Sequence, residues 1–148
     1  MEDPMIIRYI LTGITLFICT ISDIKCRRVY LSVLIGSALA GVILEIVLRD
    51  LDITLIAGGV AVGLIILVLS IASGEKIGMG DAIVVVICGL CLGFWPASSI
   101  LALSVFAAGI AGLLAMTIFK KPRDYGLPFM PFMLGAFIVY ASVSVAMT

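Results

Sequence analysis

The sequence contains no histidine, and only 12% of its 148 residues are charged. The first absence removes the usual partner of cysteine in mixed metal sites. The second, together with 64% hydrophobic residues and a mean hydropathy of +1.36, excludes a soluble globular domain. Short segments of alternating polarity are also lacking, which argues against transmembrane β-strands. The formal net charge is zero, so the total charge does not favour nucleic acid as a partner.

What the sequence does contain is a series of apolar runs, each bounded by charged residues or by Pro, Gly and Ser. Each run is close to the roughly 20 residues that a hydrocarbon core of about 30 Å requires. We therefore predict an all-α membrane protein, a six-transmembrane-helix bundle in which residues 1–148 form one integral-membrane domain. Because the start, Met-Glu-Asp-Pro, is acidic, unlike that of a signal peptide, we expect the first span to be retained. The predicted spans are residues 5–22, 29–48, 53–73, 77–95, 98–119 and 127–147.

Basic residues are distributed unevenly among the predicted loops. The loops after the first, third and fifth spans hold seven of the nine Lys and Arg residues, and the other side keeps only Arg8 and Arg49. The positive-inside rule therefore predicts that those three loops face the cytoplasm and that both termini lie outside it. The seven residues are Lys25, Arg27, Arg28, Lys76, Lys120, Lys121 and Arg123.

Small residues inside the apolar runs are interpreted as packing residues. Cys88 and Cys91 form a C-x-x-C pair in the middle of the fourth run, where no histidine could complete a mixed metal site. Gly59 and Gly63 have the spacing of a close helix contact. We predict neither a metal nor a cofactor.

Two of the nine acidic residues differ from the rest in their context. Glu45 is about one turn from Arg49, so pairing or snorkelling at the membrane interface is expected there. Asp23 ends the first predicted span, and Asp81 opens the fourth. The remaining six are interpreted as solvated: Glu2, Asp3, Asp50, Asp52, Glu75 and Asp124.

Asp23 and Asp81 are expected at the same depth in the membrane. A fourth span that began only at residue 82 would be about 21 Å long, too short to cross. A start at residue 77 gives about 28 Å and places Asp81 about 6 Å inside the cytoplasmic boundary. Gly78 and Gly80 would let a neighbouring helix or a substrate approach the acid closely.

Membrane carboxylates are rare, which makes both acids functional candidates. Two carboxyl groups that lie close together cannot both ionise cheaply, so one keeps a proton while the other stays basic. Such a pair can activate a water against a peptide carbonyl and protonate the leaving amine. The structural alternative is that Asp81 caps a helix and that Asp23 pairs with Lys25 or Arg27 among the lipid headgroups.

Three motifs resemble those of the GxGD membrane aspartic proteases, and among them the type IV prepilin peptidases. "GMGD" at residues 78–81 matches the signature around the second catalytic aspartate, and "SDIKCRR" at residues 22–28 resembles the segment at the first. "PFMPFMLGAF" at residues 128–137 resembles the stretch that opens the last helix. The motifs follow the family's order, and the six-span layout covers the whole chain.

The resemblance implies an aspartic endopeptidase with Asp23 and Asp81 as catalytic residues and Gly78 and Gly80 as motif support. It would cut the basic leader from prepilin or pseudopilin substrates at the cytoplasmic face of the cell membrane. The chain looks like the short branch associated with tight-adherence pilus systems. It has nothing that could form the zinc domain of the larger members, so no N-methyltransferase activity is expected. Two readings stay open for the last motif, a substrate groove or ordinary helix-start chemistry; its residues are Pro128, Phe129 and Pro131.

The chain departs from the family's pattern at two places. Val29, Tyr30 and Leu31 replace the usual Ile-Pro-Asn, and Ile83 stands where a lysine is common. A non-catalytic membrane subunit of a pilus or secretion machine is therefore an alternative. A carboxylate-dependent transporter is another, although its acids would usually lie near the bilayer midplane. Proteases of the presenilin and signal-peptide-peptidase sort show Pro-Ala-Leu before the last helix, which this chain lacks.

Overall fold

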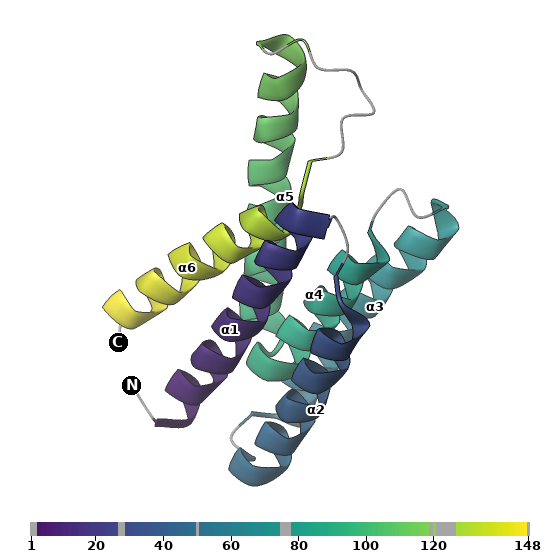
Figure 1. Ribbon diagram of the computed structural model, residues 1–148. Helices are drawn as coiled ribbons and strands as arrows, with labels where there is room; N and C mark the ends of the chain where they lie inside the picture. The colour runs from purple at the N-terminus through teal and green to yellow at the C-terminus, as the bar shows by residue number, and fades with distance from the viewer. Residues whose placement is uncertain are drawn as a thin grey trace.

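The computed structural model describes residues 3–26, 29–49, 51–74, 78–118, 120 and 127–147, and every regular element in those ranges is a helix (Figure 1). Four of the helices are long and apolar enough to cross a membrane, whereas α4 and α6 are shorter apolar helices. The protein is therefore an all-helical, multi-pass membrane protein, and the count of six crossings stays a prediction. The helices are α1 (Asp3–Cys26), α2 (Leu31–Leu48), α3 (Ile53–Ala72), α4 (Met79–Leu92), α5 (Phe94–Thr117) and α6 (Met130–Ala146).

The boundary between α4 and α5 differs most from the prediction. Gly93 has φ 84° and ψ −173°, a conformation that is essentially restricted to glycine, and it ends α4 after 14 residues. Trp95, which the sequence placed at the end of the fourth span, instead belongs to the first turn of α5. The expected start of the fourth span at residue 77 lies outside the described residues.

The short α4 forms the centre of the bundle. It packs against α1, α2, α3 and α5, and most of its side chains are buried. The closest contact is with α3, where a methyl group on Gly59 would lie 2.6 Å from the Gly89 carbonyl oxygen and one on Gly63 would lie 2.5 Å from the Val86 nitrogen. The two backbones can approach this closely only because these positions lack side chains. The α3 glycines are thus packing residues, as predicted.

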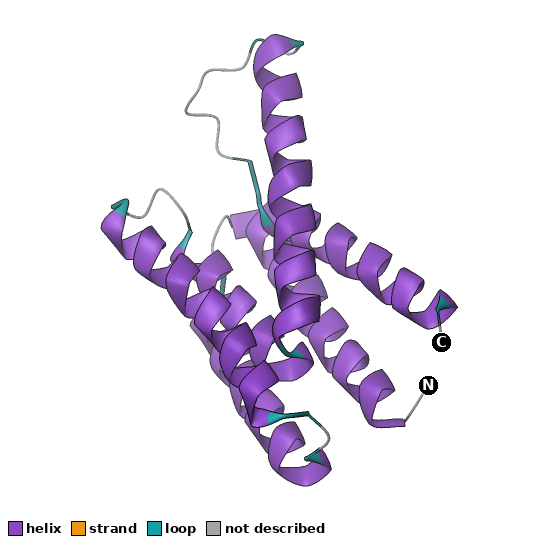
Figure 2. Cartoon of the chain, turned by 180° about the vertical axis from the view of Figure 1, so that it is seen from behind, coloured by secondary structure: helices purple, strands orange, loops and turns teal. Residues whose placement is uncertain are grey.

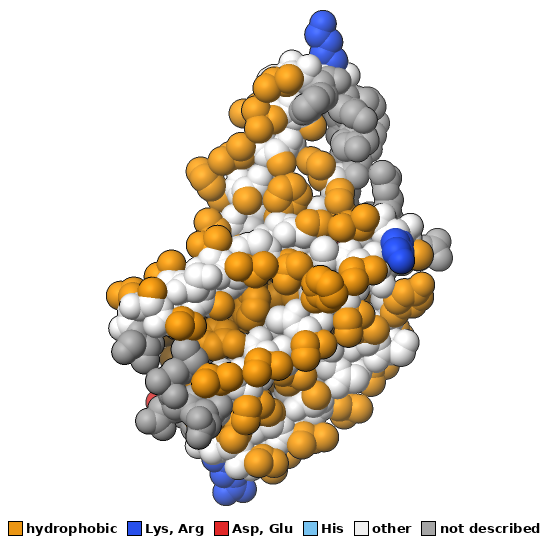
Figure 3. Space-filling view, turned by 60° about the vertical axis from the view of Figure 1, so that its left-hand side comes forward, with side chains coloured by type: hydrophobic (Ala, Val, Ile, Leu, Met, Phe, Trp, Pro, Cys, Tyr) orange, Lys and Arg blue, Asp and Glu red, His pale blue; other side chains and the backbone are white. Residues whose placement is uncertain are grey.

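The outer surface of the bundle is apolar. Side chains such as Phe17, Ile43 and Ile65 are more than half exposed, at 57%, 61% and 60%. Figure 3 shows hydrophobic side chains spread over one face, with the few basic side chains at the periphery. A surface of this kind has to be covered by lipid rather than by water.

Arg8 connects three helices, through an ion pair and a hydrogen bond, near the start of α1. Arg8 of α1 is fully buried; its Nη2 lies 2.8 Å from Oε2 of Glu45 on α2, and its Nη1 donates to the Cys91 carbonyl oxygen of α4 at 2.9 Å. The predicted pairing of Glu45 with Arg49 is therefore replaced by a contact between helices. The reason is that α1 and α2 pack side by side, which brings Arg8 level with Glu45.

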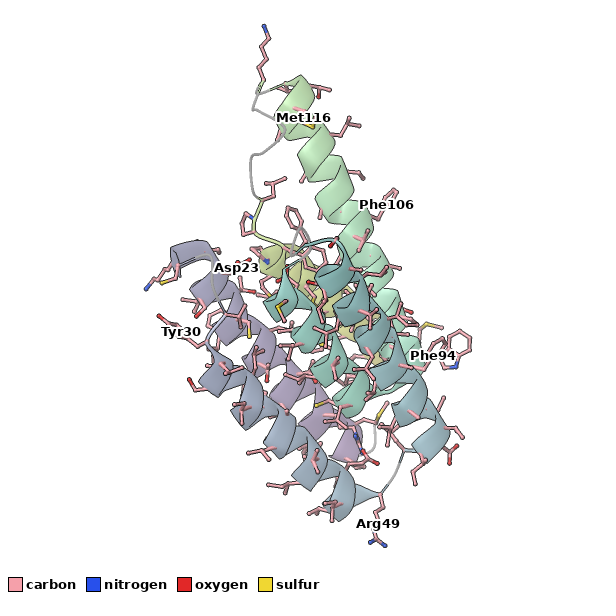
Figure 4. All side chains as sticks on the ribbon, turned by 90° about the vertical axis from the view of Figure 1, so that its right-hand side faces the viewer. Asp23, Tyr30, Arg49, Phe94, Phe106 and Met116 are labelled. Atoms are coloured by element: carbon pink, nitrogen blue, oxygen red, sulfur yellow. The ribbon has the colours of Figure 1, made fainter. Side chains whose placement is uncertain are left out.

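The helix termini divide between two ends of the bundle. Figures 1 and 2 show that α1 and α6 lie side by side, with the first turn of α1 and the last turn of α6 at the same end. Asp23 lies at the opposite end from Arg49 (Figure 4). The end with Asp23 also carries the exposed Lys25.

Candidate active site

Asp23 lies one turn before the end of α1, inside the helix and not at its end as the predicted span had it. Its carboxyl group is held by the start of α6: the Met130 N–H donates to Asp23 Oδ2 at 3.2 Å, across 107 positions of sequence. Met130 is the first residue of α6, so Asp23 faces the positive end of that helix's dipole. The contact fixes the last helix against the candidate catalytic residue.

Asp81 lies in the first turn of α4. The N-cap position is taken by Gly78, with no side-chain cap among the described residues, so Asp81 is not the capping residue that the structural alternative supposed. Gly78 instead makes room for the acid, because a methyl group there would lie 2.9 Å from Asp81 Oδ2. A methyl group on Gly80 would lie 3.0 Å from a methyl carbon of Val29, so this glycine lets the start of α4 approach the connection between α1 and α2.

The packing of α1 against α4 brings the two acids to one site. Asp23 and Asp81 are close enough for their charges to interact, and Cys19, one turn before Asp23 on α1, lies near both. Cys19 is fully buried, whereas both acids are partly exposed. The cluster is therefore closed on the side of Cys19 and partly exposed at the two carboxyl groups.

The part of the headgroup alternative that the described residues test is the pairing of Asp23 with Lys25. Lys25 is exposed, and no ion pair joins it to Asp23 in the part of the chain that the structure describes. Arg27 lies outside the described residues. Among the described residues, the hydrogen-bond partner of Asp23 is a backbone amide on a distant helix, a contact produced by tertiary packing.

Of the three residues singled out in the motif before the last helix, only one lines a pocket. Pro131, at the start of α6, lines an apolar pocket between α5 and α6, whereas Pro128 and Phe129 are not among the residues that line it. Pro131 is also the helix-start proline, a role that the sequence analysis had considered for Pro128. Met130 between them is fully buried and carries the N–H that contacts Asp23.

Met130 was missed by the sequence analysis. A backbone donor leaves no side-chain signature, so only the general tendency of helix N-termini to face acids could have pointed to it.

The residues that depart from the family's motifs take up structural positions. Val29 packs against the core and lies beside Gly80. The Tyr30 carbonyl oxygen accepts hydrogen bonds from the N–H groups of Val33 and Leu34 in the first turn of α2. Ile83 is partly buried against the same core. Cys88 and Cys91 are buried there too, and no group of three metal-binding side chains is found among the described residues.

Comparison with known proteins gives one match. A model of the type IV leader peptidase family matches residues 10–114, a segment that contains both Asp23 and Asp81. No curated protein and no solved structure matches the chain.

Proposed function

This chain belongs to the type IV leader peptidase family, and from that membership we propose that it is an aspartic endopeptidase of the membrane with Asp23 and Asp81 as its catalytic pair. One observation carries the proposal. Helices α1 and α4 bring two partly buried carboxyl groups, both inside the matched segment, close enough for their charges to interact. Ionisable residues within membrane segments are costly and rare, so a pair of them is a functional candidate.

Two carboxyl groups that share one proton can divide the chemistry of peptide hydrolysis. The ionised group removes a proton from a water molecule, which attacks the peptide carbonyl carbon. The protonated group then gives its proton to the leaving amine as the C–N bond breaks. In this scheme the Met130 N–H orients Asp23 by holding Oδ2, so Oδ1 is the oxygen that meets the water.

The proposed substrate is a prepilin or pseudopilin whose basic leader is cut just before its hydrophobic helix, at the cytoplasmic face. The charge asymmetry of the loops supports this face, because Asp23 is followed by the exposed Lys25 and lies at the opposite end of the bundle from Arg49 (Figure 4). A transporter is less consistent with the geometry, since both acids lie near one end of the bundle and not at its middle.

The test is a prepilin-cleavage assay on asparagine variants. Asn keeps the size and much of the hydrogen bonding of Asp but cannot exchange the proton, so Asp23→Asn and Asp81→Asn should each reduce cleavage by at least about a hundredfold. The double variant should be little worse than either single one, because the two groups act as one unit. Asp52→Asn is the matched control, since Asp52 is exposed at the start of α3 and should be dispensable.

The product is identified by the mass of its new N-terminus, with variants matched to wild type in membrane abundance. Substantial residual cleavage by either catalytic variant would remove the assignment of the pair. Absence of cleavage by the wild type would favour the non-catalytic subunit.

A further inference from the structure

The hydroxyl group of Thr20, on α1, is buried without a hydrogen-bond partner. Thr20 is only 7% exposed, and its Oγ1 is the one hydroxyl oxygen in the described part of the chain that is both fully buried and unpaired. A buried hydroxyl that makes no hydrogen bond costs free energy, so folded proteins rarely leave one unless it contacts water or takes part in function. The position of Thr20 therefore points to a small polar ligand.

Comparable hydroxyls in this chain are satisfied by their own helix. Serine and threonine side chains inside a helix can donate to the carbonyl oxygen four residues earlier. Thr12 and Thr15, on the same helix as Thr20, both make this bond, at 2.9 Å. Ser104, Thr117 and Ser142 make it in other helices. The Leu16 carbonyl group is at the equivalent place for Thr20, but the Thr20 hydroxyl does not bond to it.

Thr20 lies on the face of α1 that packs against α6, next to Asp23. Seven residues make almost two whole turns, so Thr20 is on the same face as Gly13. A methyl group on Gly13 would lie 3.1 Å from the Phe137 ring of α6. Asp23 is three residues after Thr20, a spacing that makes the two side chains neighbours, with about 5–6 Å between their Cβ atoms. The unpaired hydroxyl is therefore beside the carboxyl group that the Met130 N–H of α6 holds.

This arrangement suits one bound water molecule. Buried waters typically bridge polar groups that would otherwise be unsatisfied, and side chains with this separation can share one water between their oxygens. Oδ2 of Asp23 already accepts the Met130 N–H, so Oδ1 is the oxygen left for the water. A water between Thr20 Oγ1 and Asp23 Oδ1 would satisfy the buried hydroxyl and place an oxygen atom next to the candidate catalytic pair.

We propose that the Thr20 hydroxyl holds a water molecule against Oδ1 of Asp23 and that this water attacks the peptide bond. The inference rests on the proposed function. The water donates one O–H to Asp23 Oδ1 and the other to Thr20 Oγ1, which leaves a lone pair free to attack the carbonyl carbon. Asp23 takes the first proton as the O–C bond forms. Asp81 gives its proton to the amine nitrogen as the C–N bond breaks, so the pair again holds one proton.

The kinetic test replaces Thr20 by valine, which has nearly the same shape but no hydroxyl. Thr20→Val should lower kcat for prepilin cleavage by about tenfold or more with little change in KM, because the substrate still binds but the water is no longer held. Folding should not suffer, since the hydroxyl makes no hydrogen bond with any described residue. Thr20→Ser keeps the hydroxyl and should restore most of the rate.

Thr12→Val is the matched control. It makes the same exchange at another buried threonine of α1, whose hydroxyl already bonds to its own helix, so it should leave kcat unchanged. A wild-type kcat for Thr20→Val would overturn the proposal. An equal loss in Thr20→Ser would overturn it too, because the hydroxyl would then not be the group that matters.

The water itself is sought in a crystal structure of the wild-type protein, at a resolution that shows ordered water. A water within hydrogen-bond distance of Thr20 Oγ1 and Asp23 Oδ1, and lost in Thr20→Val, is the expected result. A site without ordered water, or a Thr20 hydroxyl bonded to the Leu16 carbonyl oxygen, would contradict the proposal. This measurement does not depend on cleavage, so it separates failure of the water site from failure of the proposed function.

Discussion

Replacing Arg8 by methionine should destabilise the protein more than any other exchange of a single basic residue that the structure describes. Arg8 is 0% exposed, and its guanidinium joins the Glu45 carboxylate at 2.8 Å and the Cys91 carbonyl oxygen at 2.9 Å. Methionine fills similar space but donates no hydrogen bond. Glu45, whose side chain is only 18% exposed, would then keep a charge with no ion-pair partner among the described residues.

The expected loss can be worked from these contacts. Removing one partner of a buried ion pair costs about 3–5 kcal/mol, because the other charge stays buried and unpaired. The Cys91 carbonyl loses its side-chain donor as well, and a buried acceptor left unsatisfied costs about 1–3 kcal/mol. Because the Glu45 side chain is partly exposed, the cost of leaving its charge unpaired is reduced. A loss of about 3–5 kcal/mol in the free energy of unfolding is therefore expected for Arg8→Met.

The double variant Arg8→Met with Glu45→Leu separates the charge effect from packing. Replacing both partners by apolar residues removes the unpaired carboxylate, so the double variant should recover most of the loss. Arg49→Met is the control, because Arg49 is exposed at the end of α2 and should change stability by less than about 0.5 kcal/mol. Unfolding would be measured in detergent micelles by denaturant titration. A mild Arg8→Met, or a double variant as unstable as the single one, would refute this reasoning.

Two further predictions concern the packing of the bundle and its orientation. Gly89→Ala would place a methyl group against the backbone of α3, so it should lower stability by more than about 3 kcal/mol, measured in the same denaturant titration; a change below 1 kcal/mol would contradict the contact. A cysteine at Asp52 should react with an impermeant thiol reagent in intact cells, whereas one at Lys25 should not, with native cysteines replaced; the reverse pattern would place Asp23 on the outer face.

The sequence predicted the six helices found among the described residues, and their order, because apolar runs bounded by charged residues or by Pro, Gly and Ser stand out clearly in a membrane protein. It misplaced the end of α4 because no polar residue interrupts the chain between Leu92 and Trp95. The break depends on the backbone angles of one glycine, Gly93, which composition does not report. Boundaries that rest on a single residue's conformation are therefore the least predictable part of this fold.

The acidic side chains of the candidate site could be predicted from the sequence, but the backbone group that contacts Asp23 could not. Asp23 and Asp81 stand out because acids in apolar segments are rare, and a shared depth could be worked from span lengths. The partner of Asp23, the Met130 N–H, is a backbone group and leaves no trace in residue type. Glu45 was assigned to a neighbour in its own helix because local spacing is all that a sequence offers, whereas its actual partner Arg8 comes from another helix.

The central position of α4 also determines how the end of the bundle that holds Asp81 responds to the lipid around it. Helices that contact lipid tilt or shift when the bilayer becomes thicker or thinner. Here α2, α3 and α5 carry much of the exposed apolar surface, whereas α4 is enclosed by its neighbours and held against α3 at Gly59 and Gly63. Asp81 therefore takes its position from protein contacts, and we expect the outer helices to adjust to a change in bilayer thickness with little displacement of this carboxylate.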